Sequence, residues 1–100
     1  MGSPVDLAEQ ALDDLQEISA FISRRSREEA ERFCTALIDK ALSIGDFPQI
    51  GRLVPELGDP FIREIIHGSY RIVYELQSDP GRVLILRFWH AARGVPQPFG

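Results

Sequence analysis

The stretch that decides the fold is residues 62–76, which read IREIIHGSYRIVYEL. Two runs rich in β-branched and aromatic residues flank Gly68-Ser69, a pair typical of a tight hairpin turn. We therefore predict two antiparallel strands, residues 62–67 and 70–76, joined by that turn. Arg71 alternates with its apolar neighbours, so its side chain is expected on the face opposite the core.

A third strand is predicted after this hairpin. Residues 78–81, SDPG, are a second turn signal, and residues 83–90, VLILRFWH, are apolar on both faces of a strand. This strand is expected to lie centrally, or to be covered on both sides. The glycines and prolines of the tail, residues 94–100, predict no regular element there.

Two amphipathic helices are predicted before the sheet. Apolar residues recur at three- and four-residue steps over residues 8–22 and again over residues 30–42. A short turn between the segments makes them an antiparallel helical hairpin. The solvent face of the first helix is expected to carry four acids: Glu9, Asp13, Asp14 and Glu17.

The ends of these helices are marked in the sequence. Asp6 and Glu9 are spaced to cap the first helix, and Ser26 and Glu29 are spaced as a capping box for the second. Gly45 is a natural stop for the second helix.

The segment from residue 46 to residue 60 is interrupted by prolines and glycines, which predicts an ordered loop that crosses toward the sheet. The fold class is therefore α+β, with an N-terminal antiparallel helical hairpin packed on a small, mostly antiparallel sheet of three to four strands.

Length and composition bound the problem. With 100 residues, 44% of them hydrophobic and 26% charged, the chain has the balance of one globular domain, which we place at residues 5–100. Residues 1–4, MGSP, match no element and are expected to be an expression leader outside the fold. One cysteine, Cys34, calls for no oxidising compartment, and no apolar run is long enough to span a membrane. A cytoplasmic location is expected.

Charge is distributed unevenly along the chain. The net charge of −4 argues against a simple nucleic-acid binder. Residues 1–50 carry ten acids against five bases, whereas residues 51–100 carry five acids against six arginines. Arginine forks onto phosphates or carboxylates, so anion contacts are expected in the second half.

Several short motifs together resemble the RelE/ParE toxin superfamily of bacterial type II toxin–antitoxin systems. The resemblance runs in order over residues 5–93 and is carried by ALDDL at 11–15, GRLVPE at 51–56, REI at 63–65, YRIVY at 70–74, and His90 followed by Arg93. It implies a growth-arresting toxin. The first strand usual in this family is short here, because only residues 5–7 could supply it.

The resemblance leaves two targets open. RelE-like members are described as endoribonucleases that cut messenger RNA on the ribosome, and ParE-like members as inhibitors of DNA gyrase. For RNA cleavage, Glu56 would be the general base, His90 the general acid and Arg71 the phosphate clamp. Further phosphate contacts would come from Arg52, Arg63 and Arg93. Arg71 within YRIVY favours RNA cleavage, whereas the acidic hairpin is ParE-like.

Each of these residues also has a purely structural interpretation. Glu56 could pair with Arg52, Arg71 could pair with Glu64 or Glu75, and His90 could be a capped histidine of the core. The aromatic Phe88 and Trp89 are expected in the core, and Cys34 is expected to be a buried small hydrophobe.

No cofactor or metal is predicted. The chain has no phosphate-binding glycine loop, no paired-cysteine motif and only two isolated histidines. The expected partners are a cognate antitoxin, laid over the apolar grooves of hairpin and sheet, and either the ribosome with its mRNA or DNA gyrase. A degenerate toxin that only binds antitoxin is a third possibility.

Overall fold

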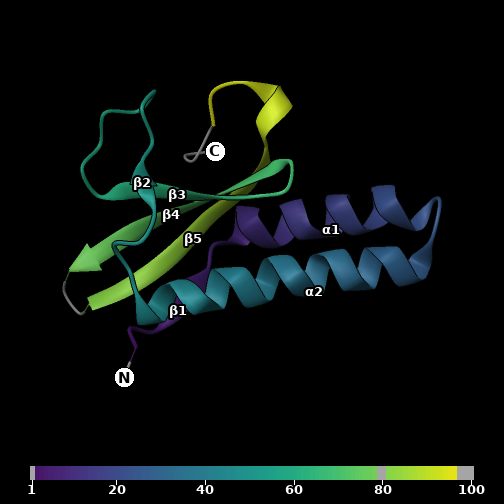
Figure 1. Ribbon diagram of the computed structural model, residues 1–100, viewed down its shortest axis with the longest axis horizontal. Helices are drawn as coiled ribbons and strands as arrows, with labels where there is room; N and C mark the ends of the chain where they lie inside the picture. Colours follow the sequence, from purple (N-terminus) through teal and green to yellow (C-terminus); the bar gives the residue numbers. More distant parts are fainter. Residues whose placement is uncertain (1, 79–80, 97–100) are drawn as a thin grey trace.

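A computed structural model describes residues 2–78 and 81–96 of the chain. In it a helical hairpin lies across one face of a twisted sheet and reaches past the end of that sheet (Figure 1). The elements in chain order are β1 (Val5–Leu7), α1 (Glu9–Ser23), α2 (Arg27–Ser43), the 3-10 turn η1 (Ile44–Asp46), β2 (Arg52–Leu53), β3 (Ile62–His67), β4 (Tyr70–Ser78), β5 (Gly81–His90) and the 3-10 turn η2 (Ala91–Arg93).

The described strands form one sheet in the order β1-β5-β4-β3-β2. β1 runs parallel to β5, and the other neighbours are antiparallel. The predicted α+β class and the predicted hairpin of β3 and β4 are confirmed, with Gly68 in the turn at a φ of 59°. The described sheet has five strands, one more than the upper end of the prediction. Two of them, β1 and β2, are short, with three and two residues.

The strand that is apolar on both faces lies inside the sheet as expected. β5 runs between β1 and β4. Of the turn predicted before it, residues 79–80 lie outside the described part of the chain, as do residues 97–100 of the tail. Between β5 and the tail, η2 is a short turn that the sequence did not predict.

The N-terminal segment takes part in the fold from Ser3 onward. The Ser3 N–H donates to the Gly45 carbonyl at 2.7 Å, and the Val83 N–H donates to the Pro4 carbonyl at 2.8 Å. A Cβ on Gly45 would lie 2.4 Å from the Ser3 oxygen, so glycine is needed there for close packing. Gly45 lies inside η1, one residue beyond the C-cap of α2. Its φ is not positive, so it does not end α2 in the left-handed conformation expected of a C-terminal glycine.

One of the two predicted helix caps is present. The Ser26 hydroxyl accepts a hydrogen bond from the Glu29 N–H at 3.2 Å, as the capping-box spacing predicts. The other prediction is wrong. α1 begins after Ala8 with no side-chain cap, because Asp6 lies in β1 and forms an ion pair with Arg82 at 2.8 Å.

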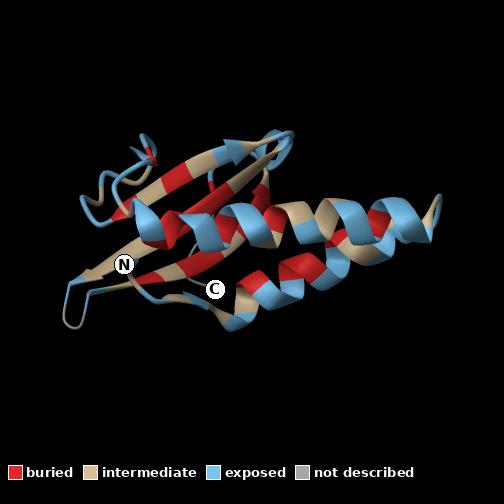
Figure 2. Ribbon diagram, turned by 60° about the horizontal axis from the view of Figure 1, so that its bottom comes forward, coloured by how far each residue is buried: buried red, intermediate tan, exposed pale blue. Residues whose placement is uncertain are grey.

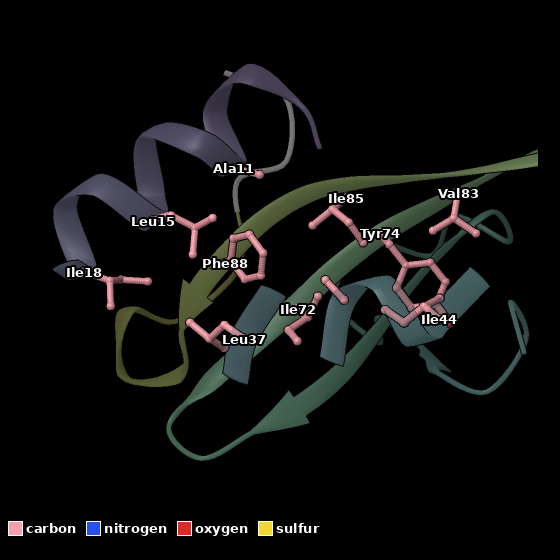
Figure 3. Close-up of a cluster of buried hydrophobic side chains, with 11 residues drawn as sticks. Ala11, Leu15, Ile18, Leu37, Ile44, Ile72, Tyr74, Val83, Ile85 and Phe88 are labelled. Carbon is pink, nitrogen blue, oxygen red and sulfur yellow. The ribbon is translucent and has the colours of Figure 1, made fainter. Parts of the chain in front are cut away.

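The core is built on both faces of the sheet. The larger cluster fills the space between the helices and the inner face, and its members point at one another in Figure 3. It includes Leu15 and Leu37 from the helices and Ile72, Tyr74 and Phe88 from the sheet. A smaller cluster on the outer face joins the loop after β2 to the sheet and consists of Val54, Ile62, Val73, Leu86 and Trp89. Phe88 and Trp89 are core residues, as predicted.

Asp14 is buried, which corrects the prediction that it lies on the solvent face of the first helix. Its residue exposure is 5%. The carboxylate receives two hydrogen bonds from the Arg87 guanidinium at 2.8 Å and a third from the Phe88 N–H at 3.0 Å. β1 pairs with β5 only as far as Ile85, so the Asp14 side chain satisfies the edge of β5 where β1 has ended.

No helix in the described part of the chain is both long enough and apolar enough to cross a membrane.

We predict that Asp14→Ala lowers the free energy of unfolding by about 3 to 5 kcal/mol, because it leaves the Arg87 guanidinium buried without its carboxylate. Denaturant unfolding followed by circular dichroism measures the change. Asp13→Ala is the matched control, since Asp13 is the exposed neighbour on the same helix, and it should cost within about 0.5 kcal/mol. Equal effects of the two substitutions would contradict the assigned role of Asp14.

Candidate functional site

A cluster of arginines and carboxylates lies on the outer face of the sheet, away from the helices. Arg71 projects from β4 toward the loop that follows β2. Both terminal nitrogens of its guanidinium donate hydrogen bonds to the Glu56 carboxylate, at 3.2 and 3.0 Å. The two groups therefore form a bidentate pair, the geometry in which arginine binds a carboxylate most strongly.

A second carboxylate, Glu64 on β3, completes this cluster. Its side chain is fully buried, and it accepts a hydrogen bond from Arg71 at 3.2 Å and one from Arg52 at 2.7 Å. Arg52 shares that carboxylate from β2, where it pairs directly with Glu64 in the sheet register. Glu64 thus joins three elements, and the cost of burying its charge is offset by two guanidinium partners.

The electrostatics of this cluster follow from its hydrogen bonds. The pKa of Glu56 is lowered from its ordinary value of 4.5, mainly by the hydrogen bond from Arg71. The same bond is the main cause that raises the pKa of Arg71, and the charge of Glu64 adds to it. Glu56 is therefore anionic near neutrality, and Arg71 already has two anionic partners.

The segment that leads into β2, just before the loop with Glu56, is held by Tyr74 from the inner face. The Tyr74 hydroxyl donates to the Pro48 carbonyl at 2.8 Å and accepts from the Gly51 N–H at 2.9 Å. A Cβ on Gly51 would lie 2.6 Å from that hydroxyl oxygen, so only glycine allows this approach. The Arg63 guanidinium donates to the Gly51 carbonyl at 2.8 Å, so it helps to position the segment that leads into β2.

His90 lies on the opposite face of the sheet from Arg71. In the register of β4 and β5, Tyr70 pairs with His90 and Arg71 pairs with Trp89. Directly opposed residues share a face, so His90 lies with Tyr70 on the helix side. The two rings confirm this by meeting edge to face with their centroids 4.9 Å apart. The His90 Nδ1 accepts the Ala92 N–H at 3.1 Å and so caps η2.

Arg93 is engaged by an aromatic ring. Its guanidinium carbon lies 4.4 Å from the centre of the Trp89 ring, and that of Arg87 lies 4.9 Å from the same ring. Trp89 therefore contacts two cations while its own indole N–H donates to the Gly94 carbonyl at 3.2 Å.

The structure thus brings some of the predicted site residues together and separates others. Glu56, Arg71 and Arg52 share one cluster, whereas Arg63 on β3 pairs with Tyr74 in the sheet register and so faces the helix side. His90 and Arg93 lie at the end of β5, and His90 also faces the helix side. Of the structural alternatives, Arg71 does pair with Glu64, whereas Arg52 pairs with Glu64 and not with Glu56.

Two carboxylates, Glu64 and Asp14, are buried although the sequence did not predict their burial. Glu64 has the same parity along β3 as the buried Ile62, a signal that could have placed it on the covered face. Asp14 carried no comparable signal, because its burial depends on β1 ending early. Cys34 is half-buried on α2, and burial raises the pKa of its thiol, as expected of a small hydrophobe. No cluster of metal-ligating side chains occurs among residues 2–78 and 81–96.

Comparison with solved structures supports the assignment of this fold. The chain is similar to the chromosomal ParDE toxin–antitoxin system of P. aeruginosa, with a TM-score of 0.73 and 14% identity over 88% of this chain and 95% of that one. It is similar to the RelBE2 toxin–antitoxin complex of Mycobacterium tuberculosis, with a TM-score of 0.67 and 20% identity over 90% and 99% of the two chains.

A third similar structure is a doubly substituted variant of the E. coli toxin RelE in the free state. Its TM-score is 0.67 at 20% identity, covering 94% of this chain and 88% of that one. No curated protein matches the chain significantly.

A helical hairpin on a small, mostly antiparallel sheet is the fold that the chain shares with these ParDE and RelBE structures. The chain belongs to the family described as the ParE toxin of the type II toxin–antitoxin system parDE, whose model matches residues 5–95, and so to the RelE/ParE superfamily. The recognition made from the sequence is confirmed.

We predict that Glu56→Gln destabilises the protein in a pH-dependent way. A carboxylate whose pKa is lowered by folding contributes stability above its unfolded value, here 4.5, and loses that contribution as the pH falls through the folded value. The variant should therefore be less stable than the wild type at pH 7, and the difference should shrink below the folded pKa.

Denaturant midpoints at a series of pH values test this, with Glu31→Gln on the exposed side of α2 as the control. A deficit for Glu56→Gln that persists unchanged into acid would mean that the charge of Glu56 is not what holds the loop.

Proposed function

We propose that this chain arrests growth by binding DNA gyrase, as ParE-like members of the superfamily are described to do, and that it does not cut RNA. The observation that carries the proposal is the state of Arg71. Both of its terminal nitrogens are occupied by Glu56, and one of them also by the buried Glu64.

A phosphate clamp must offer its guanidinium to the substrate. Arg71 has only 13% of its side chain exposed, and its partner Glu56 has 30%. A phosphate could reach Arg71 only by displacing a bidentate carboxylate, whose own negative charge would repel the newcomer. Glu56 is also a poor general base. The hydrogen bond from Arg71 lowers the pKa of Glu56, and a carboxylate with a lower pKa accepts a proton less readily.

The position of His90 adds a second argument. A general acid and a general base for one phosphodiester must reach the same scissile bond. The pleat places His90 on the helix side, beside Tyr70, and Glu56 on the outer side with Arg71. The proposed set of Glu56, Arg71 and His90 is thus split between two faces of one sheet.

The family match agrees with this argument, since the model that covers residues 5–95 is that of the ParE toxin. Binding gyrase needs a surface and no acid, base or cofactor. The net charge of −4 also suits a protein target better than the ribosome, whose RNA would have to be met by an excess of cations.

The rival function is ribosome-dependent mRNA cleavage, which the sequence alone favoured. It would require the loop with Glu56 to move away from Arg71 when the toxin binds the ribosome. The similarity to RelBE2 and RelE, at 20% identity, extends to the fold and does not select between the two targets.

We further propose that a cognate antitoxin neutralises the toxin in the cytoplasm by covering apolar surface on the hairpin and sheet. The ParDE and RelBE2 relatives are toxin–antitoxin systems by name. Several large apolar side chains are at least 45% exposed in the chain by itself and would be covered by such a partner, namely Leu12, Phe21, Leu42, Phe47, Ile50, Leu53, Phe61, Ile66 and Val95.

Two assays with antitoxin-free protein distinguish the targets. Under the proposed function the toxin inhibits supercoiling by purified gyrase in the absence of ribosomes, and it leaves ribosome-bound mRNA intact. Cleaved message with undisturbed supercoiling would overturn the proposal in favour of the nuclease. No effect in either assay would identify a degenerate toxin that only binds antitoxin.

Substitution of His90 separates the mechanisms in cells. We expect His90→Ala to keep growth arrest within about threefold of the wild type, because the gyrase mechanism uses no general acid, whereas a nuclease would lose about 100-fold or more. Arrest is measured by induction in a host without the antitoxin.

Arg71→Ala is the less informative variant. It strips Glu64 of one of its guanidinium partners in a buried position, so a loss of activity could come from unfolding alone. His90→Ala is less disruptive, because the His90 side chain accepts one hydrogen bond from an exposed turn N–H and meets the Tyr70 ring edge to face. Loss of arrest in a folded His90→Ala variant would argue for catalysis.

A further inference from the structure

The helical hairpin continues beyond the sheet that covers its base. Figures 1 and 2 show both helices extending past the strands to a turn that stands apart from the rest of the molecule. The apolar stripe of α1 runs on into this overhang. Ile18 is buried at 6% exposure, whereas Phe21, three residues later, is 68% exposed.

We call this overhang, residues 21–33, the hairpin tip. It contains a hollow of about 710 Å³. Its apolar lining comes from Phe21, Ile22 and Phe33, and its charged lining from Arg24, Arg25, Glu29 and Arg32. Phe33 anchors the floor, because its ring lies 5.6 Å from that of Tyr70 on β4, centre to centre. Phe21 also lines a second hollow of about 220 Å³ that runs toward His90 and Arg93 at the end of β5.

The lining of the hollow is cationic although the protein is acidic. Three arginines and one glutamate line the hollow, in a chain whose net charge is −4. Arg24 and Arg25 lie in the turn after α1, and Arg32 lies in the first half of α2; two more glutamates of that half, Glu28 and Glu31, are not among the lining residues. A positive rim around an apolar hollow is complementary to an acidic segment with an exposed apolar side chain.

The composition of the hairpin tip favours a protein over a nucleic acid. Aromatic side chains and arginine are enriched at the centres of protein interfaces, where an apolar anchor fills a pocket and charged groups surround it. Single-stranded nucleic acid would need aromatic platforms along a cationic groove, whereas this hollow has an aliphatic wall in Ile22 and a carboxylate in Glu29.

We propose that the hairpin tip is the surface by which the toxin engages its protein target, taking an acidic segment of DNA gyrase with an apolar side chain seated between Phe21 and Phe33. This inference rests on the proposed function. The target is favoured as occupant because the tip projects from the molecule, so a much larger protein can reach it without contacting the sheet (Figure 2). The outer-face cluster around Arg71 plays no part in this contact.

Phe21→Asp tests the inference with a close control in the same chain. Phe47 has the same 68% exposure but lies after η1, in the loop that leads to β2. Because both side chains are largely exposed, neither substitution is expected to unfold the protein, which thermal unfolding checks. We expect Phe21→Asp to raise the toxin concentration needed for half-inhibition of purified gyrase by about 30-fold or more, the loss typical of an interface hot spot. Phe47→Asp should change it by less than about threefold.

The charge component is tested by Arg25→Glu combined with Arg32→Glu. This variant should weaken inhibition of gyrase about tenfold or more at low salt, and the difference from the wild type should narrow as salt is raised. A uniform loss at all salt concentrations would mean that the arginines do not act by charge, and the acidic-segment part of the proposal would fall.

The outcomes separate this inference from the function on which it rests. A wild-type toxin that does not inhibit gyrase removes both. Inhibition by the wild type that Phe21→Asp retains leaves the proposed function standing and overturns the inference. Direct binding of the wild type to plasmid DNA, lost in Phe21→Asp, would identify the tip as a nucleic-acid surface and also overturn it.

Discussion

The arrangement of hairpin and sheet depends on one buried carboxylate. β1 leaves the edge of β5 after Ile85, and the next outward-facing N–H, that of Phe88, donates to Asp14 on α1. The same carboxylate receives two hydrogen bonds from Arg87, and this contact is the main cause of the raised pKa of that guanidinium. The Asp14 side chain thus supplies a hydrogen bond that a longer β1 would have supplied, and it fixes the position of α1 against β5.

The alternation of side chains along β4 divides the molecule into two functional halves. Tyr70, Ile72 and Tyr74 face the helices, while Arg71 and Val73 face outward. The buried Tyr74 binds the Gly51 N–H through its hydroxyl, so the core also holds the chain directly before Arg52, a member of the outer-face cluster. In that cluster Glu64 is fully buried and shared by two arginines, which is the pattern of a structural ion-pair network. An arginine engaged in this way stabilises a loop and is poorly suited to clamp a phosphate.

An exposed apolar hollow lies at the far end of the hairpin, beyond both the Asp14 contact and the outer-face cluster. The sheet covers α1 as far as Ile18, and the stripe beyond it lies open between cationic side chains. The lining of the hollow carries three arginines against one glutamate, the reverse of the acidic balance of the whole chain. Under the proposed function this surface is the one available for recognition, because gyrase inhibition by binding uses no acid or base.

How much of this could be read from the sequence depends on the range of the interactions. The hairpin at residues 62–76, the two amphipathic helices and the Ser26 cap follow from local spacing. The short motifs in order over residues 5–93 were together sufficient to recognise the toxin superfamily. The opposite facing of Arg71 and Tyr70 also follows from the period of a strand. Glu64 was one of two alternative partners that the sequence offered Arg71. The burial of Asp14, the side of the sheet on which His90 lies and the pairing of Arg71 with Glu56 do not follow from the sequence. Each joins residues far apart in the chain, and each depends on strand register, on a bulge between β4 and β5 or on where a three-residue strand ends. Local propensity determined the elements, whereas only the tertiary structure decided which charges meet, because ion pairs form between groups that packing has already brought within reach.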